Sequence, residues 1–356
     1  MDAEDISLYY VPNINTVSIR RWNMDVFNNA RTMIHFGRIF GVGPYNVITE
    51  FPNIKFERSK FWTCYNYLTL FFLLSSFLII LTTQVRIKEG TVYHLTFTLG
   101  LCTLFIAVLF LQVCGFCIGN RLSKILNNLR DFDLLFSTPP RRTFYYALIF
   151  FQLYFILICN VVFCYISVIY ISKHFYVSLV TAVHFWIVMF FSTGVIWTAD
   201  SIFECFIVMV YQRFKKLNEI FVLVVQIQEN LTDNENKHGN CESENNFRLL
   251  MNEVIKDTST FSIIRILSCL QDRVCDIAEF INKTYTFQNL LSTIISFVHI
   301  IWSSYIFAMQ TMIPHSEPTM PQLQKFAFTL PIWAFSFVAK LLTMLQICNT
   351  VRTQLM

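Results

Sequence analysis

Charged residues are scarce in this 356-residue sequence: Asp, Glu, Lys and Arg make up only 14% of it, whereas a soluble domain carries roughly 25%. Hydrophobic residues account for 55% of the chain, and its mean hydropathy is +0.51. A soluble protein this apolar would have too little polar surface to cover its core. The composition therefore excludes an ordinary soluble domain and predicts a chain whose natural solvent is lipid.

Patterns of catalytic or nucleic-acid chemistry are also missing. The sequence has no GxSxG, HExxH, glycine-rich phosphate loop, zinc-finger or RNP pattern. Cys114 and Cys117 have CxxC spacing, but they lie in an apolar run without a second pair. Most of the 11 cysteines lie in or beside apolar runs, which is typical of small buried residues. We therefore expect no enzyme, no metal, no cofactor and no nucleic-acid partner.

Long apolar runs dominate the sequence, and no cleavable signal peptide precedes the first of them. A membrane span needs about 20 mostly apolar residues, and the backbone in lipid must form its hydrogen bonds within the segment. The predicted fold is therefore all-α: a polytopic transmembrane helical bundle of six spans in the lipid bilayer. The six windows are Phe61–Gln84, Thr91–Asn120, Thr143–Ser172, His174–Ala199, Thr284–Met312 and Phe326–Thr350.

Lysine and arginine are shared unequally between the segments that flank these spans. Four alternate segments carry 22 of them, including both termini, and the other three carry four. Because basic loops stay in the cytoplasm, this bias predicts a cytoplasmic N-terminus. Asn230 and Asn282 open sequons in a predicted cytoplasmic loop, so a glycan on either would contradict the topology.

The predicted parts are a cytoplasmic segment (1–60), four spans (61–199), a cytoplasmic helical extension and loop (200–284), two spans (285–350) and a cytoplasmic tail (351–356).

Three charged residues need separate interpretation. Lys340 lies inside the sixth window, where its insertion costs about 2.5–3.5 kcal/mol and the apolar neighbours return roughly 0.3–0.6 kcal/mol each. Packing against other helices, or snorkelling, would settle its position. Asp200 and Glu204 stand one turn apart, but Asp200 lies about 26 residues, or about 39 Å of helix, past the start of the fourth window. We predict that this pair has left the bilayer and is solvated.

The long loop divides into a polar middle and two apolar stripes. The stretch from Gln228 to Asn246 is poor in apolar residues, which predicts disorder. The fourth helix is expected to continue into the cytoplasm before this stretch, and another helix is expected before the fifth span. The stripes need partners, which are each other, another subunit, or both. They consist of Ile207, Val210, Phe214, Leu217 and Phe221, and of Ile263, Ile266, Leu267, Leu270, Val274, Ile277 and Ile281.

Polar and aromatic residues gather toward the predicted extracellular ends of the spans. Aromatic walls with a few donors and acceptors are typical of a small-molecule pocket, although interfacial aromatic belts produce much the same set. His299 lies deeper and is interpreted as a packed histidine. The candidate ligand-binding residues are Tyr93, His94, Asn160, Tyr165, Tyr170, Thr181, His184, Trp186, Trp302, Tyr305, Thr329 and Trp333.

Several segments resemble those of insect gustatory receptors. Leu270–Asp276, Ile281–Asn282 and Tyr285–Leu291 resemble the entry to the fifth helix of that family. Phe36–Val42 resembles its early cytoplasmic helix, and Cys348–Thr353 resembles the start of the stretch that joins its last two helices. The resemblance implies a taste receptor subunit in the plasma membrane of sensory neurons. It also implies a tetrameric ligand-gated cation channel, formed with the same or related subunits, which binds small-molecule tastants in its outer half.

One departure from the family pattern affects this expectation. The family's seventh helix lines the pore and carries a Thr-Tyr…Gln-Phe signature, whereas Thr284, Tyr285 and Gln288 of this chain open the fifth span. The sequence stops at Met356, six residues after the sixth window, so we expect a form without the pore helix that does not conduct alone. The alternatives are a non-conducting regulatory form, a G-protein-coupled receptor with an outside N-terminus, and a six-helix transporter. A transporter would show internal repeats or broken helices, and only Pro331 lies inside a window.

Overall fold

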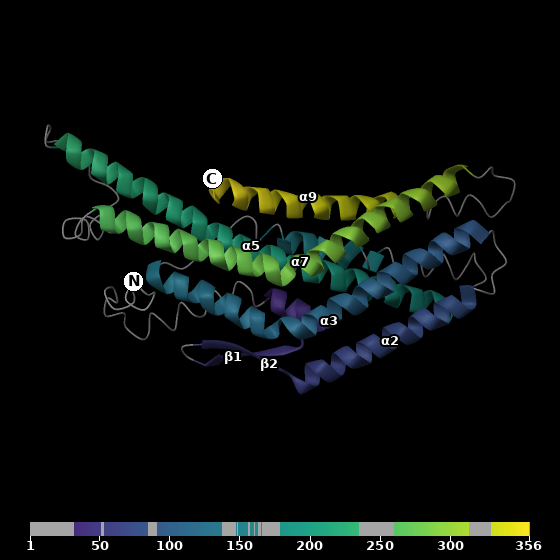
Figure 1. The fold of residues 1–356 in the computed structure, drawn as a ribbon. Helices are drawn as coiled ribbons and strands as arrows, with labels where there is room; N and C mark the ends of the chain where they lie inside the picture. The colour runs from purple at the N-terminus through teal and green to yellow at the C-terminus, as the bar shows by residue number, and fades with distance from the viewer. Residues whose placement is uncertain are drawn as a thin grey trace.

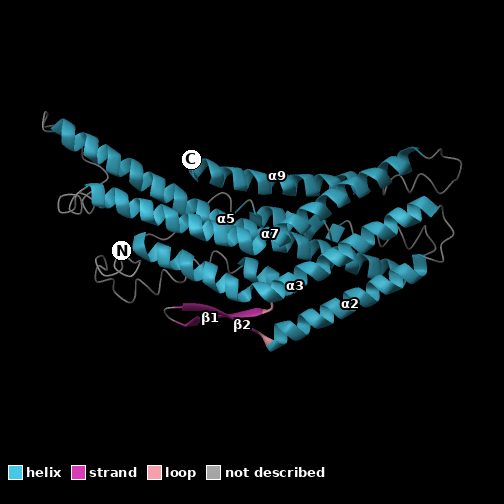
Figure 2. Ribbon diagram, in the orientation of Figure 1, coloured by secondary structure: helices cyan, strands magenta, loops and turns pink. Residues whose placement is uncertain are grey.

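A computed structural model gives the structure of the chain and describes residues 32–50, 53–84, 91–136, 147, 149–155, 157–159, 161–162, 165, 179–234, 260–312 and 329–355. Long helices dominate these residues, and one hairpin precedes them (Figures 1 and 2). The helices are α2 (Lys60–Gln84), α3 (Thr91–Phe136), α5 (Leu179–Asn234), α7 (Thr260–Met312) and α9 (Thr329–Leu355). The hairpin pairs β1 (Tyr45–Glu50) with β2 (Asn53–Arg58) in an antiparallel register.

Five helices in the described part of the chain are long and apolar enough to cross a membrane, which confirms the predicted helical transmembrane bundle. They correspond to the first, second, fourth, fifth and sixth predicted windows. Most of the third window, 143–172, lies outside the described residues, and its described stretches 149–155 and 157–159 are helical. The cytoplasmic position of the N-terminus stays a prediction from the charge bias.

Three of the helices are much longer than a bilayer requires. α3, α5 and α7 contain 46, 56 and 53 residues, or about 69, 84 and 80 Å at 1.5 Å per residue, against a hydrocarbon thickness of about 30 Å. We call the end where α2 meets α3 and α7 meets α9 the outer end, and the end where α5 finishes and α7 begins the inner end (Figure 1). The excess length projects from the inner end.

The inner parts of α5 and α7 confirm the two helices expected around the long loop. The stripe on α7 is buried at Ile263, Leu267, Val274, Ile277 and Ile281, and it shares one apolar core with the inner half of α5. Each stripe is therefore covered largely by its neighbour in the same chain, while Ile266 and Phe221 stay exposed. Subunit contact through the exposed members stays a prediction. The prediction of disorder from Gln228 onward is wrong for 228–234, because α5 continues to Asn234. The remainder of that stretch lies outside the described residues.

α5 is the central helix of the bundle. It packs against α2, α3, α7 and α9, and its side chains are buried along most of its length. α2 and α9 lie at the periphery (Figure 1) and expose large apolar side chains such as Phe71 and Leu345. Lipid covers such faces in a membrane protein, whereas the middle of α5 is enclosed by the other helices.

The segment before α2 packs on the bundle through turns that its residue types explain. Residues 32–39 form a helix, which ends where Gly41 adopts a left-handed conformation with φ 76° and Val42 N–H donates to the carbonyl of Gly37 at 2.7 Å. The β-hairpin that follows was not predicted. Tyr45 on β1 packs on Phe56 of β2, and its hydroxyl donates to the carbonyl of Gly115 on α3 at 2.9 Å. Burial raises the pKa of Tyr45.

Candidate functional site

The predicted ligand residues on α3, α5, α7 and α9 lie toward the outer end, and the structure describes only part of the set. Asn160 and Tyr170 lie outside the described residues. Tyr93 and His94 begin α3, Thr181 lies near the start of α5, and Thr329 and Trp333 lie in the first turns of α9, in each case with an undescribed side chain. The described side chains are those of Tyr165, His184, Trp186, Trp302 and Tyr305. Ligand contact by any of the twelve residues stays a prediction.

His184 joins two helices at this end, whereas Trp186 packs within its own helix and Tyr165 is exposed. The His184 ring of α5 lies 6.4 Å from the Phe72 ring of α2, and its Nδ1 lies 2.6 Å from the Val180 carbonyl oxygen. Trp186 stacks on Phe190 at 5.7 Å. Tyr165 is 69% exposed and faces away from the bundle core.

Trp302 of α7 lies directly over Gly100 of α3. A Cβ at Gly100 would approach the indole Nε1 of Trp302 to 2.7 Å, so this glycine gives the ring its space. Next to it, His299 is buried, and its Nδ1 lies 2.9 Å from the Ile295 carbonyl oxygen. The interpretation of His299 as a packed histidine is therefore confirmed.

A buried ion pair lies deeper in the bundle, where α5, α7 and α9 meet. The Lys340 ammonium of α9 is paired with Oδ2 of Asp200 on α5, and both side chains are 2% exposed. Lys340 also donates to the hydroxyl oxygens of Ser292 and Ser296 on α7, at 2.7 and 3.2 Å. The Ser292 hydroxyl in turn donates to Oδ2 of Asp200 at 2.6 Å. One lysine thus joins three helices.

The predicted solvation of Asp200 and Glu204 is wrong. Both residues are buried, with exposures of 2% each, because α7 and α9 cover α5 at this depth. The prediction counted residues along the fourth helix to find where it leaves the hydrocarbon. It then assumed that side chains beyond that point are exposed to water. Lys340 faces the same helices rather than snorkelling to the membrane surface, and the rings of Trp197 and Phe337 lie 5.6 and 6.0 Å from its ammonium.

The two serines belong to a polar stripe on α7 that the sequence reasoning missed. From Gln288 and its neighbour Asn289 onward, its members recur at spacings of three or four residues, so they lie on one helix face. That periodic signal was visible in the fifth window, where serine and asparagine carry no charge to mark them. The buried members are Gln288, Asn289, Ser292, Ser296, His299 and Ser303.

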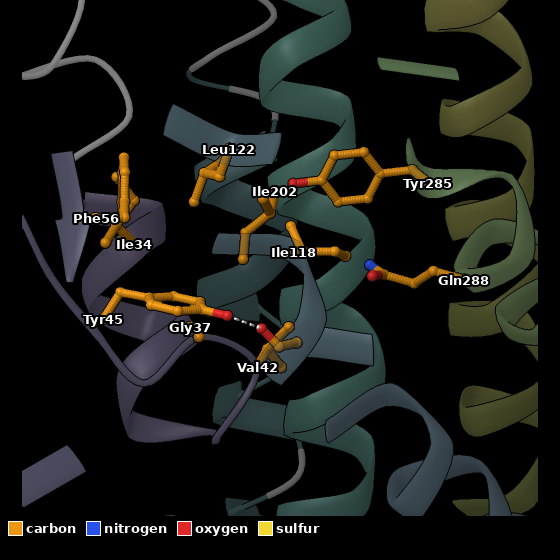
Figure 3. A pocket seen from close by; sticks show the side chains of 12 residues that line it. Ile34, Gly37, Val42, Tyr45, Phe56, Ile118, Leu122, Ile202, Tyr285 and Gln288 are labelled. Carbon is orange, nitrogen blue, oxygen red and sulfur yellow. Dashed lines mark hydrogen bonds between the residues drawn. The ribbon is translucent and has the colours of Figure 1, made fainter. Parts of the chain in front are cut away.

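A small cavity lies toward the inner end, between the N-terminal segment and the bundle. Figure 3 shows Tyr285 and Gln288 of α7 pointing toward Ile118 and Ile202, opposite Tyr45. The cavity volume is about 30 Å³, which admits water but is far below the roughly 300–1,000 Å³ of small-molecule sites. Within the described part of the chain, Oε1 of Gln288 has no hydrogen-bond partner, so this cavity suits ordered water rather than a tastant.

The comparison with protein families decides the identity of this bundle. The sequence model of a family described as 7tm chemosensory receptor matches residues 30–356. The chain belongs to this family. No curated protein matches the chain closely enough to add a relative. The family assignment confirms the resemblance seen in the sequence and favours a receptor over a six-helix transporter.

The receptor's CxxC pair lies on one face of α3 as two separate thiols. Cys114 is half-buried and Cys117 is exposed, and both are free thiols. Within the residues that the structure describes, no group of three histidine, cysteine or acidic side chains could hold a metal ion. Within the described residues, buried charges pair at two places: Lys340 with Asp200 between α9 and α5, and Arg213 with Asp133 between α5 and α3.

Proposed function

We propose that the chain is a subunit of a taste receptor that opens a cation channel when a small molecule binds near its outer end. The observation that carries this proposal is the chemosensory family match, which extends over nearly the whole chain. Taste rather than another chemical sense is supported by the likeness of Leu270–Asp276 and Tyr285–Leu291 to the gustatory pattern.

The geometry supports a ligand site at the outer end more than one at the inner end. Histidine and tryptophan side chains from α5 and α7 lie at the outer end, where aromatic surface and polar atoms occur together. The inner cavity is too small for an organic ligand. The proposed site therefore lies between the outer parts of α3, α5, α7 and α9.

The proposed receptor acts in the plasma membrane of sensory neurons and assembles as a tetramer with the same or related subunits. A ligand changes such a receptor only through a difference in its affinity for the closed and open states. We expect agonists to bind the open arrangement more tightly, so that binding shifts the population toward conduction.

The test is a calcium-indicator assay of the protein encoded by the full natural transcript, expressed in cells and exposed to a tastant panel. The proposal expects ligand-dependent cation entry that persists when heterotrimeric G-protein signalling is blocked. Ligand-evoked currents in excised patches should show the same behaviour. Responses abolished by the block would overturn the channel mechanism in favour of G-protein coupling, and responses confined to airborne odorants would overturn the taste assignment.

A further inference from the structure

α9 is attached to the bundle by a single stripe of side chains. Its buried residues Phe337, Lys340, Ile347 and Val351 recur at the spacing of a helical seam. In the described part of the chain this seam packs on α5 and α7, while the opposite face of α9 is exposed (Figure 1). Among the four seam residues, Lys340 alone is charged.

A buried polar residue in an apolar seam specifies the register of the two helices at a cost in stability. In the observed register the Lys340 ammonium faces Asp200 of α5 and the Ser292 and Ser296 hydroxyls of α7. A slide of α9 by one turn, about 5.4 Å, would separate the ammonium from Asp200. The α9 positions one turn from Lys340 are Ser336, Phe337, Thr343 and Met344, and none of them carries a charge to replace it. Asp200 would then be a buried carboxylate without a cation, so leaving the observed register has an electrostatic cost.

A chain of rings connects this register to the outer end. The ring centroids of Trp197 and Phe337 are 6.3 Å apart, those of Phe337 and His299 are 5.0 Å apart, and those of His299 and Trp302 are 6.1 Å apart. Trp197 and Phe337 also flank the Lys340 ammonium. Trp302 is one of the predicted ligand residues. These packed rings form a continuous contact route from Trp302 to the helix that carries Lys340.

We propose that Asp200, Lys340 and Ser292 form a charge lock that fixes the register of α9 and so sets the resting bias of the receptor. A ligand at the outer end acts by displacing α9 against this lock. The inference rests on the proposed function for its signalling consequence, but the lock itself is a property of the bundle. These three residues are positioning residues, because they act on the ligand site through the helices.

The functional test compares ligand-independent activity, normalised to surface protein, in the receptor encoded by the full transcript. Asp200→Asn and Lys340→Gln remove one charge each, and Asp200→Lys combined with Lys340→Asp exchanges them. Ser292→Ala removes the bridging hydroxyl and keeps both charges. The control is Lys283→Gln, which breaks the exposed pair of Lys283 with Glu279 on the surface of α7.

Each single-charge variant should shift basal activity or the half-maximal ligand concentration by roughly fivefold or more, which is the lower range of coupling between sites. The exchanged pair should return toward wild type, and the control should remain within about twofold of it. Lys340→Gln at normal surface level with wild-type basal activity and ligand response would overturn the proposal. If neither single-charge variant reaches the cell surface, the test rests on Ser292→Ala. Wild-type basal activity and ligand response in that variant would overturn the lock.

A second measurement tests the lock without relying on a response to tastants. Cys205 is 2% exposed on α5 and lies in the core that Ile347 and Val351 of α9 help to cover. Its labelling by N-ethylmaleimide, followed on its own peptide by mass spectrometry, reports whether α9 stays in place. Faster labelling in Lys340→Gln, reversed by the charge exchange, supports the lock even if no tastant evokes a response. Equal labelling in a receptor that does respond to tastants would overturn the lock and leave the proposed function standing.

Discussion

Replacing Lys340 with methionine isolates the electrostatic role of the buried pair, because methionine keeps most of the side-chain volume and removes the charge. In the structure, Asp200 would keep only the Ser292 hydroxyl as a donor to Oδ2, and its Oδ1 has no partner within the described residues. Removing one member of a buried pair costs about 3–5 kcal/mol. On the scale of about 2–4 °C per kcal/mol for domains of 150–250 residues, the unfolding temperature should fall by roughly 6–20 °C, toward the lower end in this longer chain.

The assay is thermal unfolding of the detergent-solubilised receptor followed by fluorescence-detected size exclusion. Adding Asp200→Asn to Lys340→Met removes both charges and should recover most of the loss, because a buried pair replaced as a whole is often energetically neutral. Lys283→Met should leave the unfolding temperature unchanged, since its partner Glu279 is exposed to solvent. If Lys340→Met has the same unfolding temperature as wild type, the ammonium does not compensate a buried carboxylate, and the reasoning is refuted.

Three further results are expected. Gly100→Ala should destabilise the receptor by about 1–3 kcal/mol in the same assay, because its methyl group would meet Trp302, whereas Gly43→Ala has space, with its nearest contact at 3.8 Å, and should be nearly neutral. Tyr45→Phe should cost about 1–2 kcal/mol, because the hydroxyl that bonds α3 is lost from a buried site, and an unchanged unfolding temperature would contradict that role. Asn282 should carry no glycan, as judged by an unchanged gel mobility after glycosidase treatment. A mobility shift would invert the predicted topology.

The sequence was sufficient for the fold class, because lipid imposes simple rules on a chain. Apolar windows near 20 residues long must be helices, and the structure confirms five of them among the residues it describes. The periodic stripes around the long loop also predicted the inner extensions of α5 and α7. The hairpin at 45–58 escaped prediction because two short strands beside a helical bundle give a weak alternating signal, although Tyr45 and Phe56 do face the same core.

The position of the charges was decided only by the tertiary structure. Burial of Asp200 depends on which helices surround α5, and no count of residues along α5 contains that information. Ser292 and Ser296 gained their role from a lysine about 48 and 44 positions away, at a depth set by the packing of α9. Helix formation is a local property of each apolar window, so the sequence determines it. Pairing of a buried charge depends on side chains that only the folded bundle brings together.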